Sequence, residues 1–326
     1  ELAHLIYFKN PASNHRSVRW ERTIPEISLN KGSFIRVFFA DFNQDGKVEV
    51  VAANKGAENP EVNDAPLNNI SIYQLPQDPL EGSKWKELVL TQVRIPINSQ
   101  PVDLDLDGDM DIVVGSRGEK RILWLENLGN FKFTEHDINL STDIEKGSWI
   151  TGFNMDYADL NGDGRLDIVS SVWPSSVYAL FQPAEPKDEW NIKKIGSIAP
   201  DMLVSVSLAD IDGDGDKDIF SGSYSLGSRD KDDGNTSNKA FGSVVWFENK
   251  NSRWLKNNIL RRKRGMYDKW IPLDVDKDGD VDFLGTRGNS KPYDGVIWLE
   301  QTRSKEQNPV FIQARSKDSE SVPFID

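Results

Sequence analysis

Five short segments place acidic or amide side chains at positions one, three, five and nine around a central glycine. They read DFNQDGKVE, DLDLDGDMD, DLNGDGRLD, DIDGDGDKD and DVDKDGDVD. A turn that closes at the glycine brings these four side chains to one point, where position seven can add its backbone carbonyl. Calcium prefers such oxygen ligands. Carboxylates this close would repel one another unless a cation lay among them.

The sequence therefore predicts five calcium sites. A lone match to this pattern is a weak signal, whereas five matches in phase with a strand pattern are specific. The alternative is that the segments are only solvated acidic loops. The predicted ligands are Asp41, Asn43, Asp45 and Glu49; Asp103, Asp105, Asp107 and Asp111; Asp159, Asn161, Asp163 and Asp167; Asp210, Asp212, Asp214 and Asp218; and Asp274, Asp276, Asp278 and Asp282.

A second signature follows each acidic segment, after an apolar run such as DIVVGS. It reads NISIYQL, RILWLEN, SSVYALF, SVVWFEN and GVIWLEQ, with a further copy, HLIYFKN, near the start of the chain. These are short runs of β-branched and aromatic residues, and no stretch shows a sustained helical period. Each unit thus offers about four short strands, which is typical of a β-propeller blade. A β-helical solenoid, the alternative, has shorter and more uniform repeats.

The predicted fold is an all-β propeller of four-stranded blades. Five blades are clear and one is partial, and we expect six or seven in the complete ring. The prediction is a single domain over residues 1–326, in which 1–32 form a partial N-terminal blade and 303–326 a polar tail. Residues 55–69 and 227–242 have the composition of long loops.

Composition narrows the function classes. The formal charge is 39 − 52 = −13, which argues against a nucleic-acid partner despite the basic run RRKRGMYDKW; five calcium ions would change it to −13 + 10 = −3. The absence of cysteine excludes disulfides, thiolate catalysis and cysteine-bound zinc. No apolar run has the length of a membrane span, and no signal peptide stands at Glu1. The sequence thus predicts a soluble chain that is mature, truncated or cytosolic.

The acidic pattern together with W-[FL]-E-N resembles the FG-GAP and VCBS repeat proteins over nearly the whole chain. The resemblance implies calcium in the loops between the first and second strands, on the face opposite the usual ligand face. Members of this group include adhesins, carbohydrate binders and some polysaccharide-degrading enzymes. The chain departs from the pattern at Glu49, which replaces the last aspartate, and in lacking the letters FG-GAP themselves.

Cationic and aromatic residues recur where the face opposite the acidic loops is expected. Aromatic rings stack on sugars, and guanidinium groups bind carboxylate or sulfate at two points. An anionic saccharide fits this set best. Alternatively, Trp149, Trp173 and Trp270 pack between blades while Arg117 and Arg287 pair with nearby acids. The candidate residues are Arg36, Lys55, Arg117, Trp149, Trp173, Tyr224, Arg264, Tyr267, Asp268, Lys269, Trp270 and Arg287.

We expect a secreted, periplasmic or cell-surface monomer that binds an anionic polysaccharide. One alternative is a polysaccharide lyase that acts by β-elimination on uronic-acid polymers, for which Tyr224, Tyr267, Lys269 and Arg287 are the catalytic candidates. Another is an adhesion propeller that binds protein. None of the three histidines is expected at the ligand face, which argues against a Ser-His-Asp hydrolase and a histidine-bound catalytic zinc. A glycosidase, with Asp268 and Asp294 as its carboxylates, ranks below the lyase.

Overall fold

The computed structural model describes residues 4–13, 18–57, 64–142, 144–225, 240–251, 253–288 and 294–302. The predicted tail, 303–326, and most of the predicted loop 227–242 lie outside the described residues, as does the middle of the loop 55–69. None of the helices in these ranges has the length and apolar character that crossing a bilayer requires. The chain folds into two compact units, Glu1–Ile138 and Asn139–Asp326. A single domain over residues 1–326 stays a prediction.

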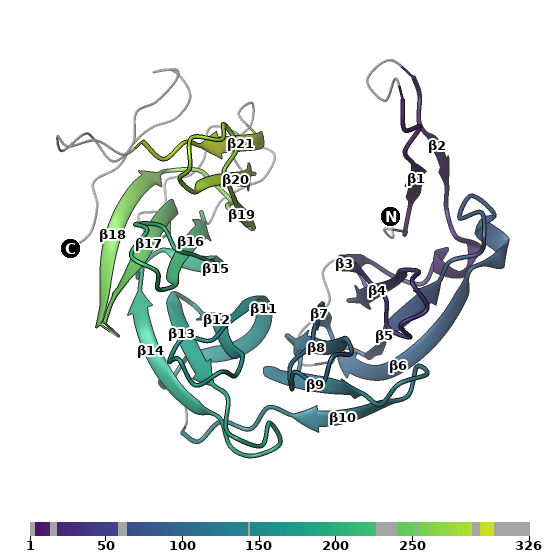
Figure 1. Cartoon of the computed structure of the whole chain (residues 1–326), viewed down its shortest axis with the longest axis horizontal. Helices are drawn as coiled ribbons and strands as arrows, with labels where there is room; N and C mark the ends of the chain where they lie inside the picture. The colour runs from purple at the N-terminus through teal and green to yellow at the C-terminus, as the bar shows by residue number, and fades with distance from the viewer. Residues whose placement is uncertain are drawn as a thin grey trace. The chain divides into compact units, whose positions relative to one another are not determined.

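The first unit contains a two-stranded ribbon and two four-stranded antiparallel sheets (Figure 1). The ribbon lies within the predicted partial blade. Each four-stranded sheet uses its strands in chain order, and two short 3-10 turns, η1 (Glu26–Ser28) and η2 (Gly82–Lys84), complete the unit. The ribbon is β1 (Tyr7–Lys9) and β2 (Glu21–Thr23); blade 1 is β3 (Phe34–Ala40), β4 (Glu49–Asn54), β5 (Leu67–Gln74) and β6 (Lys86–Arg94); blade 2 is β7 (Pro96–Val102), β8 (Asp111–Ser116), β9 (Arg121–Asn127) and β10 (Phe133–Asp137).

The second unit contains two four-stranded sheets and a sheet with three described strands. Four antiparallel strands in chain order make a propeller blade, so the predicted fold class is confirmed. Blade 3 is β11 (Trp149–Ala158), β12 (Asp167–Trp173), β13 (Ser176–Phe181) and β14 (Asn191–Ser197); blade 4 is β15 (Met202–Ala209), β16 (Asp218–Tyr224), β17 (Gly242–Lys250) and β18 (Arg253–Arg262); blade 5 is β19 (Trp270–Leu273), β20 (Asp282–Arg287) and β21 (Gly295–Leu299).

The core of each unit lies between neighbouring blades. Second strands such as β4 and β8 are buried at every position, which explains why the sequence reads there as a continuous apolar run. In the first unit, Val51 and Ile72 of blade 1 pack in one cluster with Ile112 and Leu123 of blade 2. This packing removes the facing sides of the two blades from water, so the blades stabilise one another through the hydrophobic effect.

Small polar side chains also join the blades of the second unit. Ser205 and Ser207 on β15 each donate a hydrogen bond of 2.7 Å, to the carbonyls of Tyr267 and Trp270. The Asn154 amide on β11 donates to the carbonyls of Val204 (2.5 Å) and Asp268 (3.1 Å). All three donors are fully buried, so losing one would leave a carbonyl without a partner in the core.

The tryptophans of the W-[FL]-E-N signature differ in burial. Trp124 is in the core at 1% exposure, and Trp246 packs partly buried against the cluster between blades 4 and 5. Trp298 on β21 is instead 44% exposed. The described part of blade 5 has no fourth strand beside β21, and the indole therefore remains open to solvent.

Candidate metal centres and the opposite end of the blades

The five acidic segments connect the first and second strands of their blades. We number them acidic loops 1 to 5, and each ends on the first residue of a second strand. They are residues 41–49, 103–111, 159–167, 210–218 and 274–282. The other ends of the strands carry the turns between the second and third strands and the connections from blade to blade, and we call this the opposite end.

The glycine and the first aspartate of each loop form one turn. The glycine has a φ between 83° and 98° in all five loops, a left-handed conformation that other residues adopt at a cost. Its N–H donates to the carboxylate at position one, over 2.8 Å from Gly46 to Asp41 and 3.1 Å from Gly108 to Asp103. The turn thereby fixes where the first carboxylate lies.

The carboxylate at position nine anchors the loop to its blade. One oxygen of Asp111 accepts a hydrogen bond from the N–H of Leu104 (3.1 Å), and the other accepts from Asn127, the last residue of β9 (2.7 Å). The same double contact recurs at Asp167, Asp218 and Asp282. These four aspartates are at most 1% exposed, while Glu49 is 5% exposed and accepts from Phe42 (3.1 Å).

The last residue of the W-[FL]-E-N signature has a role that the sequence analysis missed. The Asn127 amide donates to the carbonyls of Met110 in its own loop (3.0 Å) and of Phe42 in the preceding loop (2.9 Å). Gln301 reaches back in the same way to Ile211 (2.9 Å). The recurring amide was the available signal: in blades 2 and 5 this side chain ties the acidic loop to the one before it.

The acidic side chains fit a divalent cation. In acidic loops 2, 4 and 5, three carboxylates offer oxygen atoms within 4.8 Å of one another. Several of these loops also contain a buried carboxylate oxygen that accepts no hydrogen bond from any described residue. Such atoms are costly unless a cation or water satisfies them. The oxygens concerned belong to Asp103, Asp109, Asp216 and Asp274.

Burial and mutual repulsion alter the acidity of the loops in the absence of a cation. Burial raises the pKa of Asp111 to about 7, and those of Asp167 and Asp218 to about 6. Burial and then the charges of neighbouring aspartates raise the pKa of Asp109 to about 6. Burial alone would raise the pKa of Asp159, but the backbone N–H groups that donate to its carboxylate have the larger combined effect, and the pKa is lowered.

We predict that the metal-free protein becomes less stable as the pH rises from 5 to 8. The pKa of Asp111 in the folded state is about 7, above its ordinary value of 3.8. Between pH 3.8 and pH 7 the folded state therefore binds more protons than the unfolded state. Stability then falls with increasing pH. The measurement is thermal unfolding at both pH values after calcium has been stripped and removed. The Asp111→Asn variant should show a smaller difference between the unfolding midpoints at pH 5 and pH 8. A midpoint of the unsubstituted protein that is higher at pH 8 than at pH 5 would contradict the prediction.

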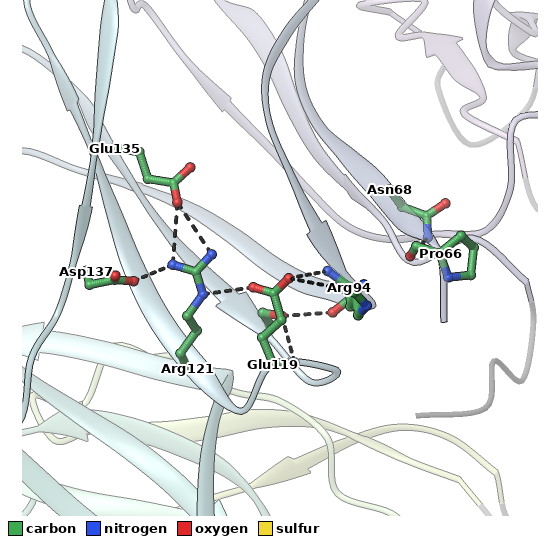
Figure 2. A network of polar contacts seen from close by, with 8 residues as sticks. Pro66, Asn68, Arg94, Glu119, Arg121, Glu135 and Asp137 are labelled. Atoms are coloured by element: carbon green, nitrogen blue, oxygen red, sulfur yellow. Dashed lines mark hydrogen bonds and ion pairs between the residues drawn. The ribbon is translucent and has the colours of Figure 1, made fainter. Parts of the chain in front are cut away.

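The opposite end of the first unit holds three predicted ligand residues and a network of ion pairs. Arg117 is exposed, and Arg36 and Lys55 are half-buried. Figure 2 shows the network, in which the Arg121 guanidinium contacts Glu119 (2.8 Å), Glu135 (3.4 Å) and Asp137. Glu119 also accepts from the backbone N–H of Arg94 on β6 (3.0 Å). The network therefore links blade 1 to blade 2.

The opposite end of the second unit brings together several predicted ligand residues. Trp149 begins β11 and Trp173 ends β12; the two are paired in register, and their rings stack with centroids 5.8 Å apart at 26°. In blades 4 and 5, Met266 forms bridges with both Tyr224 and Gly288. The segment that holds the half-buried Arg264, Asp268 and Lys269 thus runs between the ends of β16 and β20, where Tyr224 and Arg287 lie.

Two residues predicted for ligand binding are instead in the core. Trp270 is 0% exposed and Tyr267 is 1% exposed, and their rings stack 5.8 Å apart. Gly285 and Gly265 make this possible: a Cβ at Gly285 would lie 2.3 Å from the indole of Trp270, and one at Gly265 would lie 2.8 Å from the ring of Tyr267. The predicted alternative, packing between blades, therefore describes Trp270.

The sequence analysis also missed a buried ion pair at this end of blade 4. Arg261 donates from Nε and Nη2 to the two carboxylate oxygens of Asp201, at 2.7 and 2.9 Å. The guanidinium lies 4.4 Å above the ring centre of Phe241. Burial, and then the charge of nearby Arg287, lower the pKa of the adjacent Arg262. The basic run was the available signal, but its first two arginines are buried rather than solvated.

The structure also places the candidates for lyase or glycosidase catalysis and the histidines. Burial raises the pKa of Tyr267, which makes it a poor proton acceptor near neutral pH. Tyr224, Lys269 and Arg287 are half-buried. His136 lies on β10 with Nε2 2.7 Å from Glu126, His4 is half-buried near the ribbon, and His15 lies outside the described residues. Asp294 is exposed beside β21.

Comparison with known proteins supports the repeat. A family model described as FG-GAP-like repeat matches residues 103–170, which contain acidic loops 2 and 3 and the strands between them. Over these residues the resemblance to FG-GAP repeats stated above is confirmed. None of the curated proteins compared with the chain matches it.

Two solved structures are distantly similar. The first is the Pseudomonas aeruginosa PilY1 C-terminal domain, with a TM-score of 0.37 and 9% identity, covering 78% of this chain and 57% of that one. The second is the V. cholerae biofilm matrix protein Bap1, with a TM-score of 0.35 and 15% identity, covering 81% of this chain and 52% of that one. This chain spans less than two thirds of either structure.

Proposed function

We propose that the protein is a calcium-stabilised β-propeller that binds an anionic polysaccharide at the opposite end of the blades, as a monomer. We further propose that it acts in the periplasm, on the cell surface or after secretion, because loops of this kind fill at the calcium levels found there. With five calcium ions the net charge becomes −13 + 10 = −3, which weakens the repulsion that an anionic ligand would meet.

The ligand set of the acidic loops supports calcium. Each loop offers only oxygen donors, and calcium takes six to eight oxygens in flexible geometry. The bound ion would supply the charge that lets the carboxylates approach one another. The chain's own contribution is positioning, since the glycine turn fixes position one and the third strand fixes position nine. The cation therefore holds the first two strands of a blade together.

The stack of Trp149 on Trp173 is the observation that carries the ligand proposal. A pair of half-buried indoles at the ends of two strands offers a flat apolar surface, of the kind that stacks on a sugar ring. Later blades of the same unit place Arg264, Lys269 and Arg287 at the same end of their strands. Guanidinium and ammonium groups there suit the carboxylate or sulfate groups of an acidic polysaccharide.

Replacing either tryptophan, as Trp149→Ala or Trp173→Ala, is expected to weaken polysaccharide binding about tenfold. Truncation of an aromatic anchor costs more than about 1 kcal/mol, and about 1.4 kcal/mol corresponds to tenfold in affinity. The measurement is calorimetric titration of the calcium-loaded chain with a panel of uronate and sulfated polysaccharides, together with neutral glucans.

Trp298→Ala is the matched control, because it removes an indole that is 44% exposed on β21, away from the proposed surface. It should leave the affinity unchanged. An equal loss of affinity in all three variants, or tighter binding of neutral glucans than of acidic polysaccharides, would contradict the proposed site. If no polysaccharide binds while a protein partner is retained in pull-downs, the adhesion alternative gains and the carbohydrate proposal fails.

The lyase alternative is weaker than the binding proposal. Its remaining groups are Tyr224, Lys269 and Arg287, because the buried Tyr267 has a raised pKa and no exposed ring. Incubation of the protein with uronic-acid polymers tests it directly, since β-elimination creates an unsaturated uronate that absorbs ultraviolet light. An absorbance rise that Tyr224→Phe abolishes would favour the lyase over a binding module.

A further inference from the structure

Position seven divides the acidic loops into two classes. It is aspartate in loops 2, 4 and 5 and a cation, Lys47 or Arg165, in loops 1 and 3. The net charge of the nine residues differs accordingly. It is −5 in loop 2, which has five acids, and −4 in loops 4 and 5, which each have five acids and one lysine. It is −2 in loops 1 and 3, which each have three acids and one cationic residue. The attraction for a divalent cation therefore differs from loop to loop.

In loops 1 and 3, side chains of the loop itself donate hydrogen bonds to one of its carboxylates. In loop 3 the Arg165 guanidinium forms an ion pair with Asp163 at position five, and the Asn161 amide donates to the same carboxylate oxygen (2.9 Å). Arg165 also donates to the Gln182 carbonyl (3.0 Å), which holds the guanidinium over the loop. In loop 1 the Asn43 amide donates to Asp45 (3.3 Å). An incoming cation must displace these donors or share the carboxylate with them.

Loops 2, 4 and 5, which also have aspartate rather than asparagine at position three, differ from loops 1 and 3 in two further respects. They are the loops in which three carboxylates converge within 4.8 Å. The buried carboxylate oxygens of Asp103, Asp109, Asp216 and Asp274, which accept no hydrogen bond from described residues, all belong to these three loops. Asp109 and Asp216 are at position seven, so the side chain there faces the other aspartates instead of neutralising one of them. These loops have unmet acceptors that a cation satisfies.

We propose that this chain binds divalent cations at two affinities, tightly in acidic loops 2, 4 and 5 and at least about tenfold more weakly in loops 1 and 3, with the side chain at position seven setting the class. The inference rests on the calcium binding proposed above. Its physical basis is that a cation in loop 1 or 3 meets a positive side chain at position seven, which in loop 3 is held by its ion pair with Asp163, and fewer carboxylates.

Calorimetric titration of the metal-free full chain with calcium chloride tests the proposal. We expect three tight and two weak sites. Arg165→Asp should increase the number of tight sites from three to four, and Asp109→Lys should reduce it from three to two. Lys146→Asp is the matched control, because it makes the same change of charge on an exposed residue of the turn before β11, at the other end of the blade that holds Arg165.

The outcomes separate this inference from the proposed function. Five equivalent sites would overturn the two classes and leave calcium binding standing, whereas an absence of any calcium binding would overturn both. A response of Lys146→Asp equal to that of Arg165→Asp would also overturn the role of position seven, because net charge alone would then explain the change. Circular dichroism in calcium confirms that each variant is folded before its sites are counted.

Discussion

Removal of bound calcium by excess chelator is expected to lower the midpoint of thermal unfolding by at least about 10 °C. A ligand that binds only the folded state at a hundredfold its Kd contributes about 2.7 kcal/mol, and three such loops contribute about 8 kcal/mol. In a chain of this size the midpoint changes by about 1.5 °C per kcal/mol, so about 8 kcal/mol corresponds to about 12 °C. The loss should be large because each cation holds the hairpin between the first two strands of a blade.

Differential scanning calorimetry with and without chelator measures this effect, and calcium added back in excess should restore the original midpoint. Magnesium is the control, because it requires near-ideal octahedral geometry and gives up its water reluctantly, so it should restore much less. An unchanged midpoint would contradict calcium in these loops. A further rise on adding one polysaccharide in calcium would support the ligand proposal.

The second large effect is expected at the buried ion pair of blade 4. Arg261→Met should destabilise the protein by about 3–5 kcal/mol, because it leaves the carboxylate of Asp201 in the core without its cation. The carboxylate would keep its hydrogen bonds from the Phe241 N–H (2.8 Å) and the Ser243 hydroxyl, but these do not neutralise its charge. Chemical denaturation in calcium measures the free energy of unfolding.

A double variant distinguishes the buried charge from lost packing. Arg261→Met with Asp201→Leu removes both charges and should recover most of the stability, since buried pairs are often replaceable by apolar residues of similar volume. Arg253→Met is the control, because this arginine is exposed at the start of the same strand and should change stability by less than about 0.5 kcal/mol. A loss of under about 1 kcal/mol in Arg261→Met would contradict the argument.

Local sequence determined the blades and the acidic loops because both depend on short-range patterns. Period-two and continuous apolar runs predict strands, and the recurring order of four of them predicts the antiparallel sheets that the structure contains. The acidic pattern predicts a turn because its glycine adopts a positive φ and its carboxylates accept from the backbone within the same nine residues. No distant contact is required for either.

Only the tertiary structure decided which side chains at the opposite end are available to a ligand. Trp149 and Trp270 look alike in the sequence, each at the start of a first strand, yet the first is half-buried beside Trp173 and the second is fully buried against Gly285. Likewise, Arg261 in the basic run pairs with Asp201, which lies 60 residues earlier in the chain. Burial and pairing of this kind depend on neighbours from other strands and blades, and sequence spacing does not encode which residues become neighbours.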